Sequence, residues 1–202
     1  MSYSSQQTRQ RILDCAKLEF LEQGFQKANL RKIATDAKAT TGALYNHFKN
    51  KAVLFDALVK EPADTLLETF CEMHKQAEEE ASPSNKKQMT ETSEKDTDWV
   101  LDYIYDNFDA FRLIFCCSQG TAYSDYLDRL SEIEENSYRR MIHALHPSGE
   151  PVSDFFIHVI CSSGLRQLRE VVAHNLSKPE AEAFMEQIKR FRFAGWQEIL
   201  GQ

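Results

Sequence analysis

Residues 29–51 decide the fold, and they read NLRKIATDAKATTGALYNHFKNK. Asn29 and Thr40 are residue types whose side-chain oxygen accepts hydrogen bonds from the free N–H groups of a helix's first turn. They predict two short helices, over residues 30–37 and 41–48, separated by a turn at Lys38 and Ala39. Two short helices so close in sequence indicate a helix-turn-helix.

The residue types of the second of these helices suit the major groove of DNA. A recognition helix enters the groove with its N-terminal turn toward the bases, so that turn must be small or polar. Later positions can hold phosphates, which position the protein without reading sequence. The small or polar residues are Thr40, Thr41 and Gly42, and those with hydrogen-bonding or cationic tips are Tyr45, Asn46, His47, Lys49 and Lys51.

Two further helices are expected beside this motif. Apolar residues recur at helical spacing from Thr8 to Gln23, and Gly24 is expected to end that helix in a left-handed conformation. Asn50 is expected to cap a fourth helix. The residues expected to face inward from that helix are Val53, Leu54, Ala57 and Leu58.

The net charge of −7 over 202 residues argues against a nucleic-acid partner only if it is evenly spread. It is not, because residues 1–60 carry ten Lys or Arg against five acids, a net of +5. Residues 61–202 carry 14 bases against 26 acids, a net of −12. A basic head joined to an acidic body is typical of a nucleic-acid-binding module attached to a part with another task.

The body is predicted to be helical, because the whole chain has only seven glycines and five prolines. A helix over residues 61–80 is expected to begin near Pro62, whereas residues 82–98 are polar and are expected to form a loop or disordered connector. Residues 99–117 suggest two helices that bend near Asn107 and Phe108. Another helix is expected over residues 124–145, before a break at residues 146–149.

Two helices are expected to end the chain. Residues 153–174 are apolar on much of the helix circumference, and Ser177 with Glu180 forms a capping box before a final helix over residues 178–200. A helix that is apolar nearly all round must be buried on more than one side. Either the monomer core or a homodimer interface could bury it.

The segments Leu30–Ala34 and Ala39–Lys51 closely resemble the DNA-binding signature of the TetR/AcrR family of transcriptional regulators. The resemblance is strong over residues 8–58 and is limited to general layout beyond them. It implies an all-α protein of about nine helices, with a DNA-binding domain at 1–60 and a helical effector-binding and dimerisation domain at 61–202. It also implies a homodimeric repressor, formed through residues 153–174 and 178–200, that leaves a palindromic double-stranded operator when a small molecule binds.

Site residues follow from the same resemblance. Tyr45, His47 and Lys51 match positions that commonly hold phosphates, and Asn29 keeps a capping oxygen where the family usually has Ser or Thr. The turn departs from the family, which usually has Gly where this chain has Lys38. The expected DNA-binding set is Asn29, Arg31, Lys38, Thr40, Thr41, Gly42, Tyr45, Asn46, His47 and Lys51, and Lys32 is a further candidate for phosphate.

The middle of the body is rich in aromatic residues, which favour either an ordinary core or a pocket for a drug-sized effector. The candidate lining residues are Phe70, Trp99, Tyr103, Phe111, Phe115, Tyr123, Tyr126 and Tyr138. We expect some of them to line a pocket whose occupancy changes operator affinity.

Little in the sequence indicates catalysis, so an enzyme is not expected. There is no Gly-rich phosphate loop, and the pairs Cys71/His74, His143/His146 and His158/Cys161 fall short of a four-ligand zinc signature. No metal and no cofactor are therefore expected, and Cys116 with Cys117 leaves an oxidant response open. A polar N-terminus and five cysteines favour a cytoplasmic setting without a membrane anchor. The alternative function is a helical adaptor or enzyme whose basic head binds a protein or an acidic substrate.

Overall fold

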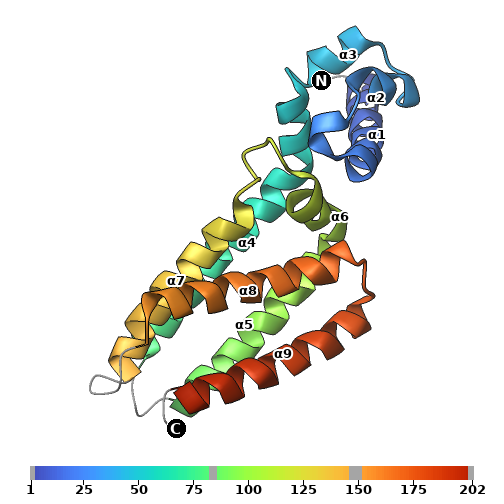
Figure 1. The fold of residues 1–202 in the computed structure, drawn as a ribbon. Coiled ribbons are helices and arrows are strands. Elements are labelled where there is room, and N and C mark those ends of the chain that lie inside the picture. Colours follow the sequence, from blue (N-terminus) through green and yellow to red (C-terminus); the bar gives the residue numbers. More distant parts are fainter. Residues whose placement is uncertain (1–2, 82–85, 146–151, 200–202) are drawn as a thin grey trace. The chain divides into compact units, whose positions relative to one another are not determined.

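The computed structural model describes residues 3–81, 86–145 and 152–199, and within them it is all-α, as expected. These ranges contain nine α-helices, one π-helical segment and no strand (Figure 1). None of these helices combines the length and apolar character needed to cross a membrane. The bounds are α1 Tyr3–Lys27, α2 Leu30–Asp36, α3 Thr41–His47, α4 Lys51–Glu80, α5 Lys86–Asp106, α6 Phe108–Arg112, η1 Leu113–Cys117, α7 Tyr126–Leu145, α8 Asp154–Ala173 and α9 Lys178–Ile199.

The chain forms two compact units. The first comprises Met1–Thr65 and Asn107–Tyr126, and the second comprises Leu66–Asp106 and Leu127–Gln202. The first unit thus contains α1 to α3, the first half of α4, and the segment with α6 and η1. The expected functional boundary at residue 60 rests on charge and stays a prediction.

The core of the first unit is built where α1, α2, α3 and α4 meet. Phe20 is fully buried, and its ring lies 5.1 Å from that of Phe55 on α4. Phe25 lies 5.5 Å from the same Phe55 ring. The other buried side chains from these helices include Ile12, Ala16, Ile33, Ala34, Leu44, Phe48, Leu54 and Val59.

The inward face of α4 differs from the expected one. Leu54 is buried as expected, but Val53 is 42% exposed and Ala57 is also exposed. Phe55 and Val59 take the inward positions, because the large Phe55 ring fills the space between Phe20 and Phe25. Helix α4 is therefore rotated about its axis relative to the expected orientation, in which Val53 and Ala57 faced inward.

The segment of residues 107–126 belongs to the first unit through specific polar contacts. Lys17 Nζ on α1 lies 2.7 Å from the Asp109 carboxylate. The Tyr123 hydroxyl donates to the Asp56 carboxylate at 2.6 Å, and the Tyr126 hydroxyl donates to the Ala63 carbonyl at 2.7 Å. These bonds tie a stretch that is distant in sequence to α1 and to the first half of α4.

Glu19 on α1 is a buried acid, with only 3% of its surface exposed. Its Oε1 accepts a hydrogen bond from the backbone N–H of Asn29 at 3.0 Å, and its Oε2 lies 2.9 Å from Lys32 Nζ. Burial raises the pKa of the Glu19 carboxyl, but the hydrogen bonds from Lys32 and Asn29 and the Lys32 charge outweigh it, so the pKa lies below its ordinary value. The carboxylate therefore joins α1 to the beginning of α2.

Gly24 interrupts the regular helix as expected, because it adopts a positive φ of 71° at a kink, and a short helical stretch continues beyond it to Lys27. Two other expectations about helix bounds are wrong. Helix α4 runs unbroken through Pro62, so no new helix begins there. Residues 86–98 belong to α5, because their sequence lacks glycine and proline and is rich in helix-forming Lys, Gln, Met and Glu. Residues 82–85 lie outside the described residues.

In the second unit, ion pairs and contacts between aromatic rings hold the helices together. Helices α8 and α9 run roughly antiparallel (Figure 1). The ring of Phe156, in the first turn of α8, lies 5.7 Å from that of Trp196, near the C-terminal end of α9. Ser153 caps α8, and Ser177 bonds the Glu180 carboxylate through its N–H and its hydroxyl before α9. The capping box of Ser177 and Glu180 was expected, whereas the Ser153 cap was not predicted. The predicted break at residues 146–149 lies outside the described residues.

Replacing Glu19 with Gln tests the joint between α1 and α2. We expect Glu19→Gln to lower the free energy of unfolding by about 1–3 kcal/mol, because a buried charge-assisted hydrogen bond is lost. Urea unfolding followed by circular dichroism measures this. The matched control is Asp36→Asn, since Asp36 holds the same Lys32 from an exposed position 3.0 Å away and should cost under about 0.5 kcal/mol. Equal losses for the two variants would contradict the role given to Glu19.

The same carboxylate makes a pH-dependent contribution to stability. Because the folded-state pKa of Glu19 lies below its ordinary value near 4.5, its contribution is complete above that pH and is lost as pH falls through the folded-state pKa. We therefore expect the difference in unfolding free energy between wild type and Glu19→Gln to shrink on acidification. Urea titrations from neutral to acidic pH measure it. A difference that stays constant would show that Glu19 does not act as a carboxylate.

Candidate nucleic-acid interface

Side-chain caps fix the first turns of both α2 and α3. The Asn29 side-chain oxygen accepts from the N–H groups of Arg31 at 2.9 Å and Lys32 at 3.4 Å, which confirms the predicted cap. Thr40 Oγ1 accepts from the Ala43 N–H at 3.0 Å. Lys38, in the turn between them, has a φ of 52°. The left-handed residue falls where the family resemblance indicated glycine, so this Lys carries a modest conformational cost.

Helix α3 is held by an apolar face and presents a polar one. Leu44 is fully buried and Phe48, which ends the helix, is 2% exposed. The opposite face is open to solvent, and Tyr45 is 50% exposed. A methyl group at Gly42 would meet only Thr40 Oγ1, at 3.9 Å. Packing therefore does not require glycine at position 42, and the missing side chain lets the helix approach another surface closely.

The ten predicted DNA-binding residues lie in one continuous region formed by α2, the turn, α3 and the first residue of α4. Whether they bind DNA stays a prediction. His47 and Lys51 are half-buried. The remaining members of the set, which are exposed or partly exposed, are Asn29, Arg31, Lys38, Thr40, Thr41, Gly42, Tyr45 and Asn46.

Several cations of the head are engaged inside the protein. Lys32 is shared between Glu19 and Asp36, so it is a poorer candidate for phosphate than its sequence position suggested. Lys51 donates to the Gln26 carbonyl at 3.0 Å and lies 5.0 Å from the centre of the Phe25 ring, and burial lowers the pKa of its ammonium. Lys17 and Lys60 face Asp109 and Asp64.

The remaining cations of the head have no carboxylate partner among the residues that the structure describes. Such a cation can neutralise a phosphate and release its counterion only where it also faces the DNA. These six are Arg9, Arg11, Lys27, Arg31, Lys38 and Lys49.

The eight candidate effector residues divide between the two units. Phe111, Phe115, Tyr123 and Tyr126 are buried in the first unit, where the rings of Phe111 and Phe115 lie 5.6 Å apart. The other four, Phe70, Trp99, Tyr103 and Tyr138, belong to the second unit. Trp99 stacks on Tyr103 at 5.0 Å. Within each unit these rings pack against protein neighbours, and an effector site stays a prediction.

Tyr138 illustrates this packing. Its ring stacks on Trp196 of α9 at 5.2 Å, and burial raises the pKa of its hydroxyl to about 12. Nearby, Arg192 of α9 forms an ion pair with the buried Glu134 at 2.8 Å. A methyl group at Gly164 would come within 2.5 Å of the Arg192 guanidinium, so Gly164 makes room for it.

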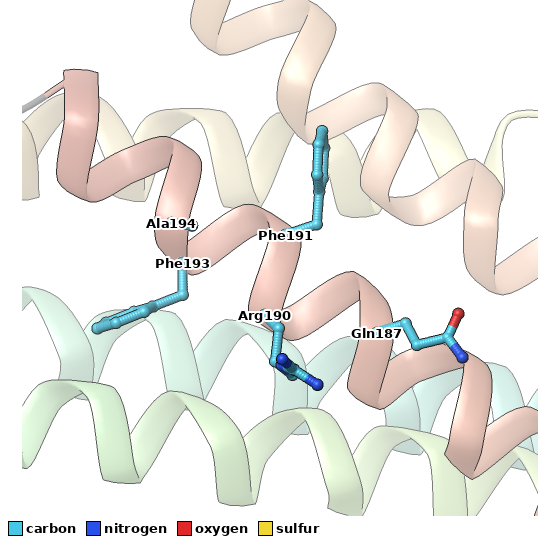
Figure 2. A pocket seen from close by; sticks show the side chains of 5 residues that line it. All are labelled: Gln187, Arg190, Phe191, Phe193 and Ala194. Carbon is cyan, nitrogen blue, oxygen red and sulfur yellow. The ribbon is translucent and has the colours of Figure 1, made fainter.

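A surface hollow on α9 was not foreseen from the sequence. It is open to solvent and is lined by Gln187, Arg190, Phe191, Phe193 and Ala194, all from one helix (Figure 2). Figure 2 shows Phe191 and Phe193 pointing to different sides of α9. Phe191 is 74% exposed, which is unusual for so large an apolar ring.

The cysteine and histidine pairs do not gather into a metal centre in the described part of the chain, where no three His, Cys, Asp or Glu side chains are arranged to hold an ion. His74 bonds the Phe70 carbonyl, and His158 bonds Glu135. Cys116 is exposed, whereas burial raises the pKa of the half-buried Cys117 and so disfavours its thiolate.

Glu19 is a structurally important residue that the sequence analysis did not single out. The spacing of Glu19 along the helix could have indicated its burial. Glu19 follows the buried Ile12 by seven residues, and in an α-helix such spacing places both on the same face.

The N-terminal part of the chain is similar in sequence to known bacterial regulators. Residues 12–58 match the profile of the bacterial regulatory proteins of the tetR family. The regulator UidR of Escherichia coli K12 is 35% identical over 72 residues, which are 36% of this chain and 37% of UidR. TtgR of Pseudomonas putida is 38% identical over 76 residues, 38% of this chain and 34% of TtgR. The match thus spans little more than a third of these relatives.

Solved structures share the fold over most of the chain. PfmR, a TetR family transcriptional regulator from Thermus thermophilus, covers 90% of this chain and 95% of its own with a TM-score of 0.56 and 20% identity. NalD, the secondary repressor of the MexAB-OprM multidrug efflux pump in Pseudomonas aeruginosa, covers 92% and 96% with a TM-score of 0.54 and 20% identity. The capped helix pair and the matching profile identify residues 12–58 as a domain of the tetR family, and the solved structures show that the chain shares their helical fold.

Proposed function

We propose that this protein is a sequence-specific DNA-binding regulator of transcription that acts in the cytoplasm and has no enzymatic activity. The observation that carries the proposal is helix α3. Its apolar face is anchored by Leu44 and Phe48, and its open face presents Thr41, Gly42, Tyr45 and Asn46. Such a helix offers small and hydrogen-bonding groups to the base edges of a major groove. The matched relatives UidR and TtgR are HTH-type transcriptional regulators.

We propose further that the working molecule is a homodimer formed through α8 and α9. These helices expose large apolar side chains, among them Phe155 at 76% and Phe191 at 74%. Val159, Phe193 and Ile199 are also exposed on the same two helices. Exposed apolar patches of this kind mark interaction surfaces, and a two-fold dimer brings two recognition helices to two half-sites of a palindrome.

Repression and effector control complete the proposal. NalD, whose fold this chain shares, is a repressor of a drug efflux pump. We infer that the acidic body binds a small molecule whose occupancy favours one of two arrangements of the dimer and so lowers operator affinity. The candidate lining is the aromatic set of the second unit, namely Phe70, Trp99, Tyr103 and Tyr138.

Tyr45 provides the first test of DNA binding. Tyr45→Ala should weaken binding by about tenfold on every duplex, because it removes one hydrogen bond to a charged phosphate without disturbing a buried side chain. By contrast, Thr41→Ala should change the relative affinity for different sequences, since Thr41 faces the bases. Fluorescence anisotropy with the DNA that flanks the gene, and with a scrambled duplex, measures both effects.

Lys51→Ala is a poor test of phosphate binding, because it also removes the bond to the Gln26 carbonyl. Lys75→Ala is a suitable control, because Lys75 is an exposed cation of the body. Wild-type protein that binds flanking and scrambled DNA equally weakly at physiological salt would refute the proposed function and favour an adaptor whose head binds another partner.

The dimer surface is tested by placing charge on it. Phe191→Asp should turn the dimer into a monomer, because it puts a carboxylate into an apolar contact. Leu18→Asp is the matched control, since Leu18 is 65% exposed but lies on α1 of the head. Sedimentation velocity measures the mass of each variant. If wild type is itself monomeric, or if Phe191→Asp remains dimeric, the interface lies elsewhere.

A further inference from the structure

Arg9 lies against the end of the helix proposed to read DNA, although it comes from α1, outside the helix-turn-helix. Its guanidinium carbon is 5.2 Å from the centre of the Phe48 ring. Phe48 is buried and ends α3, and the exposed Lys49 follows it directly. Arg9 therefore stands beside the C-terminal end of α3.

The charge of Arg9 is not neutralised inside the protein. No carboxylate among the described residues pairs with it, whereas Lys17 and Lys32 are both held by acids. Its contact with the Phe48 ring is a cation–π interaction, which orders the side chain without cancelling its charge. The result is a cation held in place near the proposed DNA surface.

The geometry suits a phosphate better than a base. A guanidinium that contacts an aromatic ring keeps N–H donors at its edge, and these match two oxygens of one phosphate. The N-terminal turn of a recognition helix faces the bases, whereas Arg9 lies at the opposite end of α3. The exposed Lys49, which follows Phe48 in the sequence, adds a second cation near this end of α3.

We propose that Arg9 binds a phosphate of the DNA backbone, so that the DNA-binding surface extends from the helix-turn-helix onto α1. This inference rests on the proposed function. Phe48 is then a positioning residue as well as part of the core, because its ring holds the guanidinium of Arg9 before DNA arrives. An ordered cation loses less conformational entropy on binding than a free side chain does.

Phosphate binding is independent of sequence, so the test needs no known operator. The full-length protein is titrated against a labelled duplex of arbitrary sequence, about 25 base pairs long, enough for two half-sites. Affinity is measured by fluorescence anisotropy at salt concentrations between about 50 and 200 mM. The variants are Arg9→Gln, which removes the charge but keeps a polar side chain, and Arg9→Lys, which keeps the charge.

Arg11→Gln is the matched control. It removes the same charge from the same helix, but residues two apart in a helix point to different sides. Arg11 also donates to Thr8 on its own helix and makes no ring contact with α3 among the described residues.

We expect Arg9→Gln to reduce the slope of log affinity against log salt by about 0.9 for each bound head, and to weaken binding about three- to tenfold near 100 mM salt. Arg9→Lys should keep the wild-type slope and bind less tightly. If Arg9 had a purely structural role, the two variants would not differ in their salt slopes. Arg9→Lys also keeps the test valid if Arg9→Gln lowers the melting temperature. Equal slopes for Arg9→Gln, Arg11→Gln and wild type would overturn the inference while leaving DNA binding intact. Failure of wild type to bind any duplex would instead refute the proposed function.

Discussion

The buried carboxylate of Glu19 is the constraint on which the head depends. A charge that is 3% exposed is stable only with partners, and here they are the Asn29 N–H and the Lys32 ammonium. Both belong to the beginning of α2, so α1 and α2 have one favourable arrangement. Asn29 meanwhile uses its side chain to cap α2. The orientation of the helix pair, and hence of α3, follows from this joint.

The same joint changes what the basic head offers to DNA. The head contains ten cations. Of these, Lys32 forms ion pairs with Glu19 and Asp36, and Lys51 donates a hydrogen bond to the Gln26 carbonyl. The cations left uncompensated among the described residues include Arg9, Arg31 and Lys49. The electrostatic contribution to DNA binding therefore depends on which cations lack partners as much as on the net charge.

The sequence was most informative where local chemistry determines structure. The caps at Asn29, Thr40 and Ser177 were predicted because each depends on one side chain and the next three residues. Prediction failed where tertiary packing decides, as for the inward face of α4, which is set by the Phe55 ring contacts with Phe20 and Phe25. It also failed at residues 86–98, where low hydrophobicity was taken to mean a loop although helix propensity was high. The partners of Lys32 and Arg9 could not be predicted, because they lie on helices distant in sequence.

In the proposed dimer, two copies of α3 read two half-sites of one operator. Hydroxyl-radical footprinting of the protein on the DNA that flanks its gene tests this most directly. The account predicts two protected patches related by two-fold symmetry, with centres separated by about 10 base pairs or a multiple of that spacing. Uniform protection, or no protection at concentrations where the protein is folded and dimeric, would contradict it.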